Sequence, residues 1–194
     1  ALNNPVLHED LKIPTNLKGG IEGYLFPDTY IFQAGTLPVK IFRHMHDELL
    51  KNITPEMQKR MQQIGYNLNE VLTFASLIEK ETGNTAERPL IASVFYNRLK
   101  KGIKLQTDPT VIYGVERKKG KILKRDLKNR HEYNTYLHAG LPPGPIASPG
   151  LAAIKAVLWP AQSKYLFFVS KNNGTHEFCV NYGCHTRAIQ TWQK

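Results

Sequence analysis

The chain has 194 residues, of which 41% are hydrophobic and 22% charged, and its formal net charge at pH 7 is +10. This length suits one domain, or one domain with a small appendage, and the composition is that of an ordinary soluble globular protein. No apolar run approaches the ~18 residues of a membrane-spanning helix, which excludes such a helix within this sequence. The positive charge favours polyanions such as nucleic acid, anionic lipid or the acidic peptides of a bacterial wall.

The densest run of basic residues lies between positions 117 and 130, where only Asp126 opposes it. It has no interleaved aromatic residues on which bases could stack, and no nucleic-acid-binding motif surrounds it. We therefore interpret this run as a solvated loop and predict no nucleic-acid partner. Its basic residues are Arg117, Lys118, Lys119, Lys121, Lys124, Arg125, Lys128 and Arg130.

Residues 1–20 are polar and interrupted by prolines and glycines, which is typical of a linker or of the tail of a removed N-terminal module. We expect the chain to be part of a longer protein, because it begins at Ala1 without an initiator methionine. The domain proper is expected at residues 21–194. Gly23–Phe32 contains two short aromatic runs around a Pro27-Asp28 turn, which favours strand or extended structure.

Apolar residues at helical spacing, bounded by capping residues, predict a series of helices. In chain order these are Val39–Lys51; a helix from Thr54-Pro55 to near Gly65; a helix capped by Asn67 or Asn69 that stops at Gly83; Leu90–Lys100, opened by Thr85 and Pro89 and closed by Gly102; a short turn from Asp108-Pro109 to Gly114; Leu151–Leu158, capped by Ser148-Pro149; and a final helix from about His185.

The segment Gly140–Gly150 (GLPPGPIASPG) is too rich in proline and glycine to be regular, so we predict a rigid loop. Tyr165–Ser170 and His176–Val180 flank Asn172-Asn173-Gly174, which predicts a β-hairpin. Helices dominate and strands are few. The predicted fold class is α+β, a mainly helical domain with a small antiparallel sheet that includes the C-terminal β-hairpin.

One carboxylate is placed for chemistry at the end of a buried helix. The run Val71–Ile78 is apolar nearly all round, and Glu79 follows it directly. Burial and the negative end of the helix dipole would both raise the pKa of this carboxyl group, as a general acid for a glycosidic leaving group requires. Alternatively, Glu79 pairs with Arg98 or Lys80, or is solvated. Glu81 faces another side of the helix and is interpreted as a solvent-exposed or supporting carboxylate.

Two segments offer groups suited to binding sugars. Amide, hydroxyl and carboxylate side chains follow one another in the turn at residues 106–110, although plain helix capping would also explain the carboxylate. The segment 133–136 combines aromatic faces with hydrogen-bonding groups, although a structured loop with partly buried tyrosines would explain it as well. The candidate substrate-binding residues are Gln106, Thr107, Asp108, Asn134 and Tyr136.

The seven histidines do not form a recognisable metal-binding pattern. His44 and His46 are two residues apart on a predicted helix and cannot converge on one ion, and His176 and His185 lack the spacing of a known metal motif. The glycine-rich loops of NTPases and dinucleotide-binding enzymes are also missing. We predict no metal and no cofactor.

The only cysteines are Cys179 and Cys184, and their spacing is not that of a zinc site. A turn containing Gly183 would bring them within disulfide range in an oxidising compartment. Two unpaired thiols are equally compatible with the sequence.

Six segments, in order from about residue 22 towards the hairpin, carry a likeness to a known family. They are Glu22–Tyr30, Ala75–Thr82, Ser93–Leu99, Leu105–Gly114, Tyr133–Tyr136 and Gly140–Ile146. Together they resemble the MltG/YceG-like endolytic murein transglycosylases, so residues 21–194 are expected to be a YceG-like catalytic domain.

The resemblance implies a lyase that cleaves the β-1,4 bond between N-acetylmuramic acid and N-acetylglucosamine within peptidoglycan strands. Such a reaction leaves 1,6-anhydromuramoyl ends and limits glycan strand length. In the family the first glutamate of an E-K-E-[TA] motif is the single catalytic acid and base, which implies Glu79 here. A hydrolytic muramidase and a non-catalytic peptidoglycan-binding module are the alternatives.

The resemblance also implies a location and partners. Intact family members carry an N-terminal membrane helix and a small LysM-like module, neither of which is in this sequence. We expect the protein at the periplasmic face of the bacterial inner membrane, with peptidoglycan synthases as candidate partners and with membrane contact only through that anchor.

Overall fold

The protein is represented by a computed structural model that describes residues 11, 13, 20–113 and 122–193. Most of the predicted linker 1–20 and the first part of the basic run, from Arg117 to Lys121, therefore lie outside the described residues. Leu11 and Ile13 are buried in the main core. None of the described helices has the length and hydropathy of a membrane-spanning segment.

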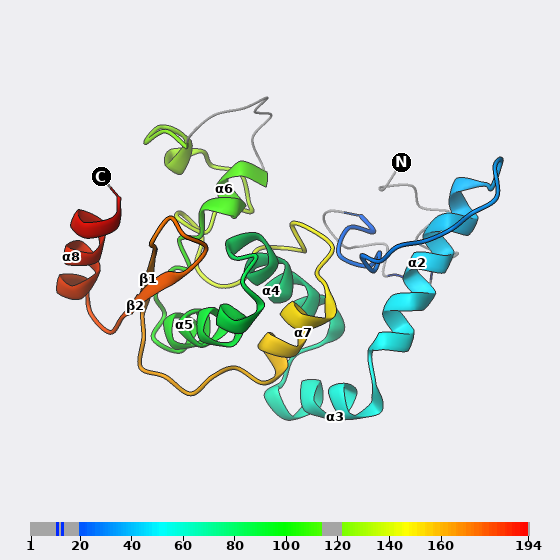
Figure 1. Ribbon diagram of the computed structural model, residues 1–194, viewed down its shortest axis with the longest axis horizontal. Coiled ribbons are helices and arrows are strands. Elements are labelled where there is room, and N and C mark those ends of the chain that lie inside the picture. The colour runs from blue at the N-terminus through cyan, green and yellow to red at the C-terminus, as the bar shows by residue number, and fades with distance from the viewer. Residues whose placement is uncertain (1–10, 12, 14–19, 114–121, 194) are drawn as a thin grey trace.

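Three helices form the centre of the molecule (Figure 1): α4 (Leu68–Glu81), α5 (Arg88–Lys100) and α7 (Leu151–Leu158). Phe74 of α4 and Phe95 of α5 are almost completely buried, and their ring centroids lie 6.1 Å apart. Val71 to Ile78 are all buried, as the apolar run predicts. The helix that carries the two motif glutamates is therefore fixed by packing along most of its length.

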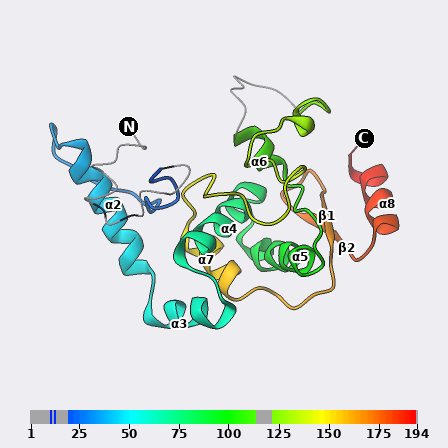
Figure 2. The same cartoon turned by 180° about the vertical axis from the view of Figure 1, so that it is seen from behind.

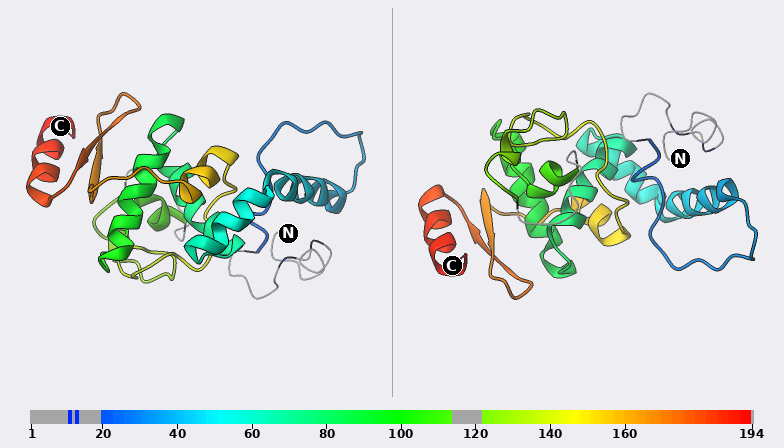
Figure 3. Two further views of the ribbon diagram at one scale, coloured as in Figure 1. Left: turned by 90° about the horizontal axis from the view of Figure 1, so that it is seen from below. Right: turned by 90° about the horizontal axis from the view of Figure 1, so that it is seen from above.

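The remaining helices surround this centre. α2 (Pro38–Asn52) extends away from the body together with the irregular segment before it, as Figure 3 shows, and α3 (Pro55–Ile64) connects it to α4. α6 (Asp108–Tyr113) packs against α4. Two short 3-10 helices are η1 (Thr85–Glu87), which leads into α5, and η2 (Asp126–Lys128).

The C-terminal part forms a small unit at the end of the molecule opposite α2, seen from behind in Figure 2. β1 (Phe167–Ser170) and β2 (His176–Cys179) pair antiparallel, with Phe168 opposite Phe178, and α8 (Tyr182–Trp192) packs on them. Val169, Cys179 and Ala188 are the buried residues of a second hydrophobic core. The hairpin and the α+β class are thus confirmed.

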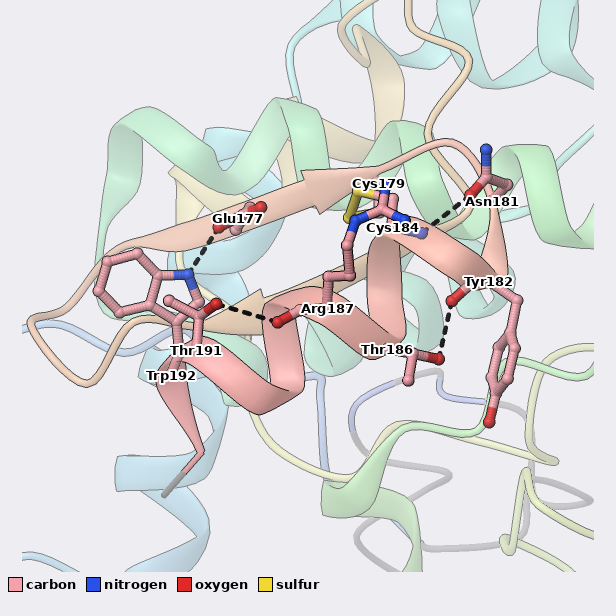
Figure 4. The surroundings of a disulfide bond; sticks show 9 residues. All are labelled: Glu177, Cys179, Asn181, Tyr182, Cys184, Thr186, Arg187, Thr191 and Trp192. Atoms are coloured by element: carbon pink, nitrogen blue, oxygen red, sulfur yellow. Dashed lines mark hydrogen bonds between the residues drawn. A yellow bond between two sulfur atoms is a disulfide. The ribbon is translucent and has the colours of Figure 1, made fainter.

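Cys179 and Cys184 form a disulfide, which decides between the two states that the sequence left open. Figure 4 shows that the bond joins the end of β2 to the first turn of α8. At the other end of the helix, Trp192 Nε1 donates a hydrogen bond of 2.6 Å to Glu177 Oε2. The last helix is therefore fastened to β2 at both ends.

The caps that the sequence predicts for α3 and α4 are present. The Thr54 hydroxyl accepts a hydrogen bond from Met57 N, and Gly65 ends α3 with φ +72°. Asn67 and Glu70 form a reciprocal capping box at the start of α4. These boundaries are set by residues within one turn of the helix end, which explains why local sequence predicts them.

Two boundary predictions, the starts of α7 and α8, were wrong. Gly23–Phe32, predicted as strand or extended structure, forms no strand; Gly23 has φ +87°, and a Cβ there would lie 2.4 Å from Pro145. α7 is preceded by Gly150 as its N-cap, because the Ser148 hydroxyl is used to accept a hydrogen bond from Gly23 N. α4 ends at Glu81 with Thr82 as its C-cap, so Gly83 follows directly after the cap, as predicted. α8 begins at Tyr182, where Asn181 caps it, three residues before the predicted start.

Candidate active site

A cavity of about 850 Å³ lies at the C-terminal end of α4. Its walls come from α4, α5, the turn before α6, the segment at Tyr136 and the C-terminal unit. Among the described residues that line it, Glu81 is included and Glu79 is not. The two motif glutamates thus have different surroundings, although only one residue separates them.

Glu79 is used to hold neighbouring elements together. Its Oε1 accepts a hydrogen bond of 2.6 Å from Arg88 Nη2, and its Oε2 accepts one of 3.1 Å from the backbone N–H of Gly150. The Arg88 side chain is only 10% exposed and that of Glu79 is 26% exposed. Of the sequence-based alternatives, an ion pair is therefore present, but its partner is Arg88 rather than Arg98 or Lys80. The pair joins α4 to the start of α5 and to the N-terminus of α7.

Glu81, the last residue of α4, faces the cavity. The Thr107 hydroxyl donates a hydrogen bond to its Oε1. Burial raises the pKa of Glu81 to about 7, the Thr107 hydrogen bond lowers it, and the nearby charge of Asp108 raises it further. A carboxyl group with this pKa is partly protonated near neutral pH, so it can both donate and accept a proton there.

The structure brings together the two segments that the sequence proposed for sugar binding. Gln106, with φ +52°, donates its backbone N–H to Thr135 O at 3.2 Å, and Thr107 donates its own to Thr135 Oγ1 at 3.1 Å. The Tyr136 hydroxyl donates a hydrogen bond of 2.6 Å to Asp108 Oδ1. Gln106, Asp108 and Tyr136 all line the cavity.

Two of the five predicted substrate-binding residues, Thr107 and Asn134, are buried and use their side chains to bind other groups of the protein. Thr107 is 2% exposed and uses its hydroxyl on Glu81. Asn134 is fully buried, and its Nδ2 donates to the carbonyls of Leu127 and Asn129 at 3.1 and 2.8 Å. These contacts give Asn134 a role in shaping the loop and give Thr107 a role in orienting Glu81.

Arg98 is a cavity residue that the sequence marks in two ways, as part of the Ser93–Leu99 motif and as an alternative partner for Glu79. Its Nε donates to Leu166 O at 2.7 Å, and its Nη1 donates to Lys104 O and Leu105 O at 3.1 and 2.6 Å. Its guanidinium also lies 5.0 Å from the centroid of the Phe167 ring. Arg98 therefore ties the C-terminal unit to α5. These carbonyls are 6 to 68 residues away from Arg98 in the chain, so local sequence could not predict that Arg98 binds them.

The two histidines considered for a metal have other partners. His176 Nδ1 lies 2.7 Å from Glu87 Oε2, and the backbone N–H of His176 donates to Glu87 Oε1 at 3.0 Å. The ring of His185 stacks on Phe167 at 4.9 Å, and burial lowers its pKa. Both histidines line the cavity.

The profile of the YceG-like family matches residues 4–191. A Bacillus subtilis (strain 168) protein named endolytic murein transglycosylase is 40% identical over 177 residues, which are 91% of this chain and 49% of the relative. A protein of the same name from Streptococcus pneumoniae serotype 2 (strain D39) is 35% identical over 193 residues, 95% of this chain and 35% of the relative. The chain thus spans about half of the length of the first relative and about a third of the length of the second.

A solved structure is also similar. The crystal structure of a putative yceG-like protein from Listeria monocytogenes superposes with a TM-score of 0.85 at 33% sequence identity. The match covers 96% of this chain and 64% of that chain. The likeness to this protein in sequence and in fold therefore extends over almost the whole chain.

Proposed function

Because the chain belongs to the YceG-like family, we propose that it is the catalytic part of an endolytic lytic transglycosylase. Its substrate would be the β-1,4 bond between N-acetylmuramic acid and N-acetylglucosamine inside peptidoglycan strands. The observation that carries this proposal is a carboxyl group, Glu81, that lines a large cavity and has a pKa raised to about 7.

The geometry supports Glu81, rather than Glu79, as the general acid. Glu79 has both carboxylate oxygens occupied by Arg88 and Gly150, and it is not among the described residues that line the cavity. Glu81 lines the cavity, and among the described residues only Thr107 holds its carboxylate, through Oε1. We therefore assign the acid to Glu81 and assign Glu79 the task of positioning Arg88 and the start of α7.

The reaction can proceed with this one carboxyl group. Glu81 donates its proton to the glycosidic oxygen as the bond to the anomeric carbon of the muramoyl unit breaks. The 6-hydroxyl oxygen of the same sugar then bonds to that carbon, and its proton passes to the Glu81 carboxylate. Because the nucleophile is part of the substrate, its effective concentration is high and no activated water is needed.

Hydrolysis by a muramidase is the second candidate, and one observation favours it. Asp108 is a second carboxylate that lines the same cavity, and glycoside hydrolases work with two. In the structure Asp108 accepts a hydrogen bond from Tyr136, which suits a positioning role as well. Only the products separate the two reactions.

The test compares Glu81→Gln with Glu79→Gln on purified peptidoglycan, with products analysed by mass spectrometry. We expect Glu81→Gln to lower the release of anhydromuropeptides by about 10²- to 10⁴-fold, with an unchanged circular dichroism spectrum. Substantial activity in Glu81→Gln would overturn the assignment of the acid. Wild-type products that end in reducing muramic acid, one water heavier, would establish a muramidase, and strand binding without turnover would establish a binding module.

The placement of the protein at the periplasmic face of the inner membrane, and an association with peptidoglycan synthases, stay predictions. The disulfide between Cys179 and Cys184 supports a compartment outside the cytoplasm, where such bonds persist.

A further inference from the structure

Two arginines of α5, Arg88 and Arg98, are buried to the same extent, each being 8% exposed. Arg88 has Glu79 as its ion-pair partner. Arg98 forms no ion pair with any carboxylate of the described residues, because its Nε and Nη1 donate only to neutral backbone carbonyls. Buried cations in proteins are normally paired with an anion. Arg98 therefore has a charge for which a ligand can supply the partner.

One nitrogen of the Arg98 guanidinium is open. Nη2 makes no hydrogen bond to the described residues, and it is not one of the unpaired buried atoms, which include Arg88 Nε, so it remains accessible to solvent. Arg98 lines the cavity that contains Glu81, as does Phe167, and the guanidinium lies 5.0 Å from the centroid of the Phe167 ring. The small accessible part of this buried side chain thus faces the cavity, and the carbonyls hold it in a fixed orientation.

The open cation and the proposed acid share one tyrosine as a neighbour. Burial and the hydrogen bond to Asp108 raise the pKa of the Tyr136 hydroxyl, the charge of Glu81 raises it further, and the charge of Arg98 lowers it. Tyr136 is thus within electrostatic range of both Glu81 and Arg98, and all four side chains line the cavity. A ligand that reaches Glu81 in this cavity also meets an unpaired cation.

The chemistry of the strand indicates which group would pair with that cation. A guanidinium binds carboxylates through charge-assisted hydrogen bonds. N-acetylglucosamine has no ionised group, whereas the muramoyl unit carries a lactyl substituent on its sugar ring. The lactyl carboxylate is free in a strand without peptide, and in a strand with peptide the stem peptide attached there supplies carboxylates. A cation beside the acid therefore distinguishes the two alternating sugars, and with them the two alternating glycosidic bonds.

We propose that Arg98 is a specificity-determining residue of this cavity, and that its Nη2 binds a carboxylate of the muramoyl substituent. The proposal rests on the function proposed above for the choice of strand. Phe167, which packs on the guanidinium, and the carbonyls bonded to Nε and Nη1 hold Nη2 in place for this contact. The unit that carries the anion then sets the register of the strand before proton transfer.

The test compares small ligands on the wild-type protein by NMR titration, because Arg98 also supports the fold. N-acetylmuramic acid has the lactyl carboxylate, and its methyl ester has the same ring without the charge. N-acetylmuramoyl-L-alanine carries its carboxylate at the first peptide residue. We expect at least one of the two acids to bind about ten-fold more tightly than the ester and to shift the Nε–H signal of Arg98. The acid that binds more tightly tells whether Arg98 selects peptide-free or peptide-bearing strands.

Variants connect the preference to Arg98. Arg98→Gln, with folding checked by circular dichroism, should bind acid and ester with equal affinity. Arg60→Gln is the matched control, because Arg60 Nε also donates to a carbonyl, Leu158 O at 2.8 Å, but Arg60 does not line the cavity. It should keep the ten-fold preference. If Arg98→Gln does not fold, the affinities of the wild type and the shift of its Arg98 signal decide the question.

The proposal is overturned if the wild type binds both acids no more tightly than the ester, or if the ester shifts the Arg98 signal as much as the acids do. A folded Arg98→Gln variant that keeps the preference overturns it as well. Turnover is a separate measurement. A chain that prefers the acids through Arg98 but releases no anhydromuropeptides retains the carboxylate site and loses the proposed activity, and the reverse result loses the carboxylate site alone.

Discussion

Arg88 Nη2 lies 2.6 Å from Glu79 Oε1, so the carboxylate at the end of the buried run of α4 already has a cation as its partner. The Nε of the same arginine is buried and makes no hydrogen bond to the described residues. Arg88 therefore depends on Glu79 for its charge compensation, and the consequences of removing Glu79 are primarily structural.

Glu79→Ala should lower the free energy of unfolding by about 2 kcal/mol, because it leaves the Arg88 guanidinium buried without its carboxylate. Glu79 is partly exposed, so this value is below that for a fully buried pair. The difference between wild type and variant in the free energy of unfolding in urea measures this loss. Glu79→Gln should keep the bond to Gly150, lose less stability and remain within about ten-fold of wild-type activity. If Glu79→Gln is as inactive as Glu81→Gln while fully stable, Glu79 is the acid after all.

The raised pKa of Glu81 makes stability depend on pH. The folded protein holds this proton up to a pKa of about 7, whereas the unfolded chain releases it at its ordinary value of 4.5. The contribution to stability is therefore complete below pH 4.5 and is lost as the pH rises through about 7, by on the order of 3 kcal/mol. Glu81→Gln should remove this dependence, so wild type and variant should diverge in urea unfolding between about pH 4 and about pH 8.

The protonation state of Glu81 should also determine how activity depends on pH. If Glu81 is the acid, turnover should fall as the pH rises above about 7, because the protonated form is lost. The rate of anhydromuropeptide release against pH measures this. A rate that keeps rising through this range would contradict the assignment.

Asn134→Ala should act on the fold rather than on sugar binding. The side chain is fully buried and donates to two backbone carbonyls, and its Oδ1 accepts from Tyr136 N at 3.0 Å. Its removal leaves these groups unpaired and should cost about 2 kcal/mol of unfolding free energy. Activity at a temperature where the variant is folded should fall mainly through the displacement of Tyr136. An unchanged stability with a large loss of affinity for glycan would instead restore the predicted role in binding.

Reduction of the disulfide, or the double change of Cys179 and Cys184 to serine, should weaken the C-terminal unit. The bond closes a short loop with a sequence separation of 5, for which chain entropy gives about 2 kcal/mol. His185 and Ile189 of α8 line the cavity, so loosening α8 should also reduce turnover. Hydrogen exchange should show faster exchange in α8 and unchanged exchange in α4. Faster exchange throughout would mean that the bond stabilises the whole molecule.

Local signals in the sequence were sufficient for much of the fold. The Thr54 and Asn67 caps lie beside the helices they bound, and the Asn173-Gly174 turn lies between its two strands. Ser148 was misassigned as a cap because its hydroxyl is used by Gly23, 125 residues away, which no local pattern reveals.

The candidate site was predictable only in part for the same reason. Helical spacing does show that Glu79 and Glu81 point in different directions. Which of them faces the cavity depends on Thr107, Arg88 and Gly150, all from other segments. Buried Asn134 resembles a sugar-binding asparagine in the sequence, because composition cannot distinguish an amide that pairs with backbone from one that faces a ligand.

The separate core of the C-terminal unit has a consequence for how a long strand gains access to Glu81. Val169, Cys179 and Ala188 form this core, but Phe168 and Phe178 of the same unit pack against the main core, and the Phe168 ring lies 5.9 Å from that of Phe95. In the reaction proposed above the strand is cut in its interior and offers no free end, so it has to enter the cavity from the side. Moving the C-terminal unit to admit it would break the Phe95–Phe168 contact as well as the hydrogen bonds of Arg98 and Glu87, so we expect this wall to stay in place while the strand binds.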